Sequence, residues 1–322
     1  MKRRELILLP FLLALAVPFV AQSADEKVYR LGELALTSES IEITRRTTLP
    51  ELAKLGFSEG RNLVLDERVG DRAALPGLAR ALVLGKPDAI IAISIDAIRA
   101  AHEATHTVPI IAFGPDLVLA GLAASLAHPG GNVTGVQIFA AELDGKRLDM
   151  LRETIPTAHR MAALLLRSMP GQEANLAAMR SVAADRGVEL LVFEAAGPDD
   201  YPAAFAAMRS AGAQALIIQA NPVFYSDAAT LAGLAIEAHL PAVCEWADMA
   251  QSGCLLGYGP SRLELRQRLA HQVAHIFQGS DPADLPIEQP TKFEMAFNLK
   301  TAKALGLTIP LVLLTRADET IE

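Results

Sequence analysis

The strongest constraint on the fold is an alternation of apolar strands and amphipathic helices that occurs twice along the chain. In the first half, short apolar runs at residues 88–93 and 108–113 are separated by a segment with helical periodicity. Strands buried on both faces form continuous runs of Ile, Val and Ala, so these runs predict a parallel sheet with right-handed helical crossovers. The same plan begins again at residue 160 and continues with an apolar run at residues 213–219. We therefore predict an α/β fold with two doubly wound parallel-sheet lobes.

The two halves also match in detail. Residues 88–92 (DAIIA) and 215–219 (ALIIQ) each lead through a predicted helix to a second strand, which contains Pro109 or Pro241. The length of 322 residues exceeds the size at which a single core usually stops growing, about 250–300 residues. Length and internal similarity together favour two lobes of the same type.

The first 24 residues are interpreted separately from the fold. Residues 2–4 are basic, residues 6–20 are apolar, and small residues follow at positions 21–24. This order is typical of a secretory signal peptide, and the apolar stretch is short for a membrane span. We predict a cleaved signal peptide at residues 1–24 and a periplasmic mature protein; an uncleaved membrane anchor is the alternative.

The charge balance argues against one class of partner. The chain has 29 basic and 37 acidic residues, whereas binding to nucleic acid depends on clustered Lys and Arg. We therefore expect no nucleic-acid partner.

Two cysteines, Cys244 and Cys254, are the only ones in the chain. An oxidising compartment would permit a disulfide between them, but a bridge also needs a suitable separation of the Cα atoms. We interpret them as two small buried side chains and leave their pairing open.

The expected site follows from the strand assignments. In an open parallel sheet, ligands bind beyond the carboxyl ends of the strands, where loops meet helix N-termini. Two lobes that face each other would place these loops around one cleft that closes by hinge motion. The predicted ligand-binding residues are Thr37, Ser38, Ser94, Ile95, Asp96, Phe113, Asp116 and Gln137 in lobe one, and Ser168, Asn221, Phe224, Glu245 and Trp246 in lobe two.

Glu245 and Trp246 are the most distinctive members of this set. Trp246 is the only Trp in the chain, and its ring offers an apolar face to a ligand, while Glu245 could meet an ammonium group. The alternative is that Trp246 packs in the core and Glu245 is solvated. Ser38 and Ser94 could equally be helix caps.

Residues 102–106 (HEATH) fit the pattern H-E-x-x-H. In zinc proteases, the two His of this pattern hold the metal from one helix and the Glu acts as a base. Here Thr107 and Pro109 end the predicted helix at once. We expect no enzymatic activity, no catalytic or metal-ligating residue and no cofactor; a zinc-dependent hydrolase that uses His102, Glu103 and His106 is the alternative function.

Three segments resemble the signatures of one protein family, in the expected order. They are residues 55–63 (LGFSEGRNL), residues 129–136 (PGGNVTGV) and the stretch from 289–293 (QPTKF) to 298–302 (NLKTA). They are similar to the ABC transporter substrate-binding proteins of the tryptophan/tyrosine-binding type. Where this family often has Gly/Thr-Pro-Ala after the third strand, this chain has Ser94, Ile95 and Asp96, and the Asp96 carboxylate would disfavour an anion at that helix start.

The resemblance implies a type I periplasmic binding fold, with three hinge strands near residues 137–141, 258–260 and 281–287. The implied division is a lobe one of residues 25–138 plus 259–282, and a lobe two of residues 139–258 plus 283–322.

The resemblance also implies a function: the periplasmic solute-binding component of an ABC importer. The implied ligand is an amino acid or a related aromatic or aliphatic acid, and the implied protein partners are the ABC transporter permease subunits. We expect a monomer. A ligand-sensing lobe for a signalling partner would share this fold and is a second alternative.

Overall fold

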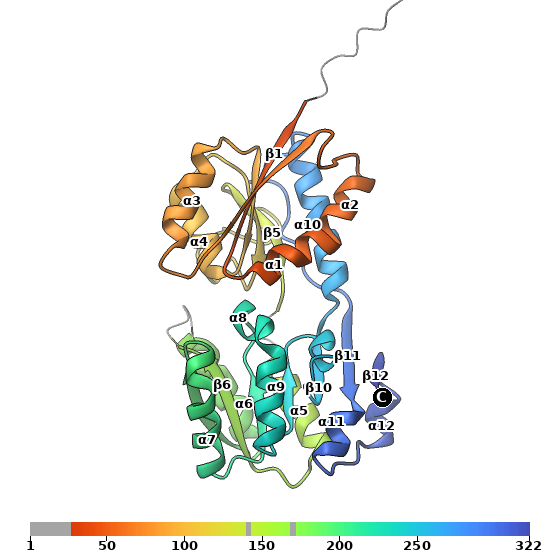
Figure 1. Ribbon diagram of the computed structural model, residues 1–322. Coiled ribbons are helices and arrows are strands. Elements are labelled where there is room, and N and C mark those ends of the chain that lie inside the picture. Colours follow the sequence, from red (N-terminus) through yellow and green to blue (C-terminus); the bar gives the residue numbers. More distant parts are fainter. Residues whose placement is uncertain (1–26, 140–142, 168–171) are drawn as a thin grey trace, which may run out of the picture.

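The computed structural model describes residues 27–139, 143–167 and 172–322 as two α/β lobes, one above the other (Figure 1). The predicted signal peptide and the predicted site residue Ser168 lie outside the described residues. Within these three ranges, no helix is both long enough and apolar enough to cross a membrane.

Lobe one is a five-stranded parallel sheet in the order β2-β1-β3-β4-β5, with helices on both faces. Its elements are β1 (Tyr29–Ala35), α1 (Ser38–Ile43), a π-helical turn η1 (Thr44–Thr48), α2 (Leu49–Lys54), β2 (Leu63–Val69), α3 (Leu75–Leu84), β3 (Ala89–Ile93), α4 (Ile95–Ala104), β4 (Ile110–Gly114) and β5 (Val133–Gln137).

Lobe two repeats this order as β7-β6-β8-β9-β10 and extends it with β11, antiparallel to β10, and β12. Its elements are α5 (Asp144–Thr154), β6 (Arg160–Leu166), α6 (Gln172–Asp185), β7 (Glu189–Ala195), η2 (Pro198–Asp200), α7 (Tyr201–Ser210), β8 (Ala215–Ile218), α8 (Pro222–Ser226), α9 (Ala228–Glu237), β9 (Ala242–Cys244), η3 (Ala247–Ala250), β10 (Leu256–Pro260), β11 (Phe293–Asn298), α11 (Leu299–Ala304), α12 (Leu311–Leu314) and β12 (Glu319–Ile321).

The central strands explain why the two sheets form. Every residue of β3, β4 and β8 is buried, as expected for strands covered on both faces. Parallel registers such as Ile90 opposite Ile110 and Leu216 opposite Ala242 place apolar side chains beside one another. The prediction of two similar doubly wound lobes is confirmed.

One helix that the sequence pattern predicts is absent. The periodicity of residues 117–127 favours a helix after β4, but these residues form a series of turns. The Asp116 carboxylate accepts hydrogen bonds from the backbone N–H groups of Val118 and Leu119 at 2.9 Å, as a helix cap does, but only turns follow. Gly121 then takes a φ of +72°, which glycine tolerates but which ends a right-handed helix.

The first helical segment begins earlier than its periodicity predicts. The pattern favours helical structure from residue 42, but α1 starts at Ser38 because the Thr37 side chain caps it by accepting from the N–H of Ser40. The π-helical turn η1 follows, just before Pro50, which has no N–H to donate. This turn directs Thr44 and Thr48 into the buried interior of lobe one.

The chain crosses between the lobes three times: after β5, between β10 and helix α10 (Arg262–Phe277), and before β11. Helix α10 returns to lobe one, as implied, and packs on α2, η1 and β5. The third crossing differs from the prediction at residues 281–287. Ile287 packs in the lobe-one core and donates its N–H to Leu126, and Glu288 donates its N–H to Gly135. The predicted boundary at residue 283 is therefore wrong, and the crossing lies at residues 289–292.

Candidate ligand-binding cleft

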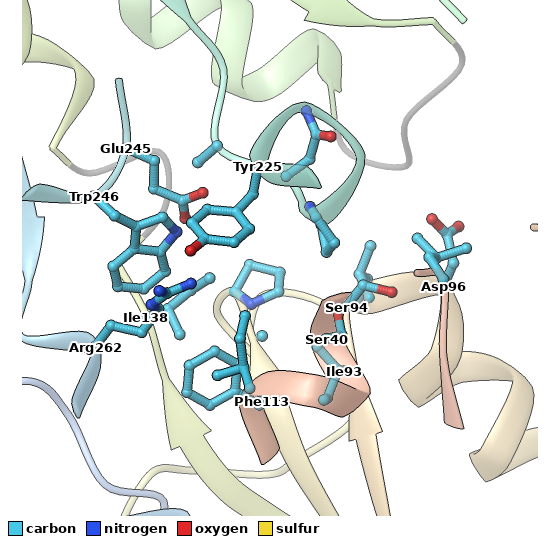
Figure 2. A pocket seen from close by; sticks show the side chains of 18 of the residues that line it. Ser40, Ile93, Ser94, Asp96, Phe113, Ile138, Tyr225, Glu245, Trp246 and Arg262 are labelled. Carbon is cyan, nitrogen blue, oxygen red and sulfur yellow. The ribbon is translucent and has the colours of Figure 1, made fainter. Parts of the chain in front are cut away.

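A cavity of about 760 Å³, which includes space that opens to solvent, lies between the carboxyl ends of the strands of both lobes. Figure 2 shows side chains from both lobes pointing into it. Seven of the predicted site residues line this cavity: Ser94, Ile95, Asp96, Phe113, Asn221, Glu245 and Trp246.

Five other predicted site residues do not line this cavity. Thr37 caps α1, Ser38 is exposed at the start of that helix, and Asp116 holds the turn after β4. Gln137 is buried in β5, where its backbone N–H donates to Glu288. Phe224 is fully buried in lobe two, where its ring contacts that of Tyr201.

The prediction missed several residues that complete the cavity. Ser40 and Ile43 come from α1, Tyr225 from α8, and Arg262 and Arg266 from α10. The apolar side chains of Leu36, Ile93, Ile138 and Leu166 form much of the remaining wall. The positions of the strand ends predict none of the α10 residues. Helix α10 follows a crossing of the chain between the lobes, and not a loop that connects a strand to the next helix of the same lobe.

Glu245 is 4% exposed, and its carboxylate points toward Tyr225 and the cavity in Figure 2. Burial raises the pKa of Glu245 to about 7, although the positive charge of Arg147 and a hydrogen bond from the Trp246 side chain oppose the rise. Trp246 is 5% exposed and belongs both to the core of lobe two and to the cavity wall. The alternative of a solvated Glu245 is wrong.

The backbone at Glu245 is held in place by a fully buried arginine. Arg147 of α5 donates to the Glu245 carbonyl at 3.2 Å and to the Tyr258 carbonyl at 2.9 Å, and it pairs with Asp144 at 2.8 Å. The Glu245 carbonyl also lies against Gly259 of β10, where a Cβ would be only 2.0 Å from the oxygen. This strand therefore needs glycine where the site-bearing loop crosses it.

Cys244 and Cys254 form a disulfide with a Cα–Cα separation of 6.5 Å. The interpretation of two separate thiols is wrong, although both side chains are buried. The bridge closes the loop that carries Glu245, Trp246 and Asp248. Closing a loop of this length stabilises the fold by about 3 kcal/mol, mainly by restricting the unfolded chain.

Arg262 joins the first turn of α10 to lobe two. It forms an ion pair with Asp248, and its Cζ lies 4.2 Å from the centre of the Tyr225 ring. The Tyr225 hydroxyl also donates to Asp248 at 3.3 Å. Burial raises the pKa of both Asp248 and Tyr225, that of Tyr225 to about 12, although the charge of Arg262 opposes both shifts.

Ser94, at the start of α4, both caps this helix and lines the cavity. The Ser94 side chain accepts from the N–H of Ala97 at 3.3 Å, so the helix-cap interpretation holds for a residue that also lines the cavity. Ser94 has φ of +90° and ψ of 157°, a strained backbone region that is rare outside glycine. Asp96 forms an ion pair with Arg72 at 3.1 Å, which compensates its charge.

The H-E-x-x-H segment does not have the arrangement of a zinc protease. Helix α4 ends at Ala104 and Thr105 is extended, so His106 lies beyond the helix that carries His102. Nδ1 of His102 is 3.1 Å from the Asn132 side chain. Among the described residues, no group of three or more His, Cys, Asp or Glu is placed to hold a metal.

Known proteins share this sequence and architecture. A model of the ABC transporter substrate binding protein family matches residues 36–321. A tyrosine-binding protein of Clostridioides difficile is 23% identical over 271 residues, which cover 83% of this chain and 78% of that protein.

Solved structures match over most of the chain. A conserved domain protein from Vibrio cholerae has a TM-score of 0.85 and 23% identity, with 91% of this chain and 100% of that chain covered. An ABC domain in complex with L-Trp from Streptococcus pneumoniae has a TM-score of 0.83 and 22% identity, with 92% of this chain and 100% of that chain covered. These likenesses confirm the type I periplasmic binding fold. The family match extends from the residue after β1 to the end of β12, and the chain therefore belongs to the ABC transporter substrate binding protein family.

Proposed function

We propose that this chain is the periplasmic receptor of an ABC importer and binds an amino acid, or a related aromatic or aliphatic acid, in the interlobe cavity. One observation supports this most: a mostly apolar cavity, formed by the strand ends of both lobes, contains the buried carboxyl group of Glu245. Pockets for small molecules combine apolar walls with a few polar groups that fix the orientation of the ligand. The proposal includes a monomeric receptor that delivers its ligand to the permease subunits.

The walls suit an apolar side chain. Phe113 and Ile93 of lobe one and Trp246 of lobe two line the same cavity, which Figure 2 shows. A ligand side chain between these surfaces would be removed from water when the lobes close, which stabilises the closed state by about 25 cal/mol for each Å² of buried apolar surface. The relatives named as binding tyrosine or L-Trp have ligands of this kind.

Glu245 suits an ammonium group. A positive charge beside a buried carboxylate favours its ionised form, so an ammonium group would lower the raised pKa of Glu245. The Arg147 hydrogen bond to the Glu245 carbonyl fixes the backbone and leaves the carboxylate directed into the cavity.

The test is calorimetric titration of the full chain with L-tryptophan, L-tyrosine and L-leucine. We expect at least one to bind the wild type, and Glu245→Gln to weaken that binding about 10- to 100-fold, the usual value of a hydrogen bond to a charged group. For the wild type, affinity should fall about tenfold for each pH unit below about 7, because protonated Glu245 must release its proton. Glu245→Gln should remove this pH dependence.

Glu173→Gln is the matched control, because Glu173 is exposed on α6 in the same lobe. It should keep the wild-type affinity and its pH dependence. If no amino acid binds the wild type, the proposed function is wrong. If Glu245→Gln binds as tightly as the wild type at every pH, the role of Glu245 is wrong.

A further inference from the structure

Two arginines from the first turns of α10 line the cavity, and their charges are compensated to different extents. Arg262 pairs with the Asp248 carboxylate and stacks on Tyr225. Arg266, one helical turn further along, forms no ion pair with any carboxylate of the described residues. The second arginine is therefore a cation without a direct counter-charge in the described part of the chain.

Arg266 is 3% exposed, and its guanidinium lies over the Phe113 ring with the Cζ 4.2 Å from the ring centre. Its Nη1 donates to the Thr44 hydroxyl at 3.1 Å. Its Nε is buried and has no hydrogen-bond partner among the described residues. The stack on Phe113 and the bond to Thr44 fix the plane of the guanidinium and leave donors unused.

Glu33 is the acid whose charge acts most on Arg266, but Thr44 separates the two groups. The Thr44 hydroxyl donates to the Glu33 carboxylate at 2.7 Å. Glu33 is 4% exposed, and burial raises its pKa to about 8, against the opposing effects of Thr44 and Arg266. Burial lowers the pKa of Arg266 to about 10. Burial thus favours the neutral form of Glu33, and Thr44 keeps its carboxyl group from pairing directly with Arg266.

A buried cation without a counter-charge destabilises a protein unless an anion pairs with it. A guanidinium offers parallel N–H donors that match the two oxygens of a carboxylate. From these observations we infer that Arg266 is the carboxylate anchor of the cavity and makes it selective for ligands with a carboxylate over the corresponding amines. This inference rests on the proposed function and specifies which end of the ligand Arg266 holds.

The position of Arg266 also predicts the orientation of the bound ligand. Arg266 comes from α10, which packs on lobe one, whereas Glu245 belongs to lobe two. An amino acid would then have its carboxylate bound from the lobe-one side and its ammonium group bound by lobe two. Such a ligand interacts with both lobes only when they are together, so it favours the closed form over the open one.

The test compares two sets of probes by calorimetry at pH 7.5: L-tryptophan, indole-3-propionate and tryptamine, and L-leucine, 4-methylpentanoate and 3-methylbutylamine. In the set that the wild type binds, we expect the deaminated acid to bind at least about tenfold more tightly than the amine. Arg266→Met should weaken binding of the amino acid and of the acid about 10- to 100-fold, as expected for loss of a charge-assisted pair. It should leave binding of the amine unchanged.

Two further variants separate this effect from a general loss of structure. Arg80→Met removes a charge from the exposed face of α3 and should leave all affinities at the wild-type values. Arg266→Lys keeps the charge but loses the planar donor pair, so it should bind the acid with intermediate affinity. Arg266→Lys provides the measurement if Arg266→Met does not fold, as judged by circular dichroism.

Different results would contradict the role of Arg266 and the proposed receptor function. Unchanged affinity of a folded Arg266 variant for the acid, or a wild type that binds amines as tightly as acids, would overturn the role of Arg266 and leave the receptor function intact. A wild type that binds neither L-tyrosine nor any of the six probes would overturn the proposed function itself.

Discussion

Gly259→Ala is expected to destabilise the protein by about 3 kcal/mol or more and to abolish ligand binding. The added Cβ would lie 2.0 Å from the Glu245 carbonyl oxygen. This oxygen is a backbone atom, so it cannot rotate away as an atom of a flexible side chain could. Either β10 or the loop that carries Glu245 must shift, and forced overpacking of this kind usually costs about 1–3 kcal/mol, or more where backbone is involved.

Thermal unfolding and calorimetric titration of Gly259→Ala measure the two effects. A loss of about 3 kcal/mol should lower the melting temperature by about 5 °C in a chain of this size. Gly233→Ala is the control: Gly233 lies in α9, and no atom is within 4 Å of the added Cβ. It should match the wild type or be stabilised by about 1 kcal/mol. Wild-type stability and affinity in Gly259→Ala would contradict the close contact between β10 and the site loop.

Glu33→Gln is expected to make the protein more stable at alkaline pH. Burial raises the pKa of Glu33 from 4.5 to about 8. Between these pH values, folded Glu33 holds a proton that the unfolded chain has released. Stability falls with rising pH wherever the folded state binds more protons, so the wild type should lose stability between about pH 4.5 and pH 8. The loss is on the order of 5 kcal/mol, and it stops above the folded pKa.

Urea unfolding at pH 5 and pH 9 tests this prediction. The amide of the Glu33→Gln variant cannot ionise, so the variant should keep only the smaller decline caused by Glu245 and Asp248, whose raised pKa values act in the same direction. Glu173→Gln again serves as the control, because it changes an exposed carboxyl group on α6 and should retain the full decline. Equal pH dependence in the wild type and Glu33→Gln would show that Glu33 is ionised in the folded protein.

The sequence predicted the sheets well because buried parallel strands are almost continuous apolar runs. The runs predicted at residues 88–93 and 213–219 contain β3 and β8, and β6 begins at Arg160, where the pattern was expected to begin again. The geometry of turns was harder to anticipate. The helix expected after β4 does not form, although Asp116 bonds to the N–H groups of Val118 and Leu119 as a helix cap does, because the chain turns and Gly121 takes a φ of +72°.

The lining of the interlobe cavity was predicted in part for a similar physical reason. Residues that directly follow a strand, such as Ser94 and Glu245, must lie at the sheet edge once the strand is assigned. Arg266 could not be found this way, since its partner Thr44 is 222 residues away in the chain. Their contact depends on α10 packing on η1, and no local pattern encodes that packing. The disulfide likewise depends on how the loop after β9 folds back onto β10.

The most direct test of the account is the fluorescence of Trp246. It is the only Trp in the chain, and it lies in the wall of the interlobe cavity, so its emission reports on that site alone. Titration with L-leucine and L-tyrosine, excited where only Trp absorbs, should give a saturable change for the ligand that binds by calorimetry, with the same dissociation constant. Calorimetric binding without any change in Trp246 emission would place the ligand elsewhere and contradict the interlobe site.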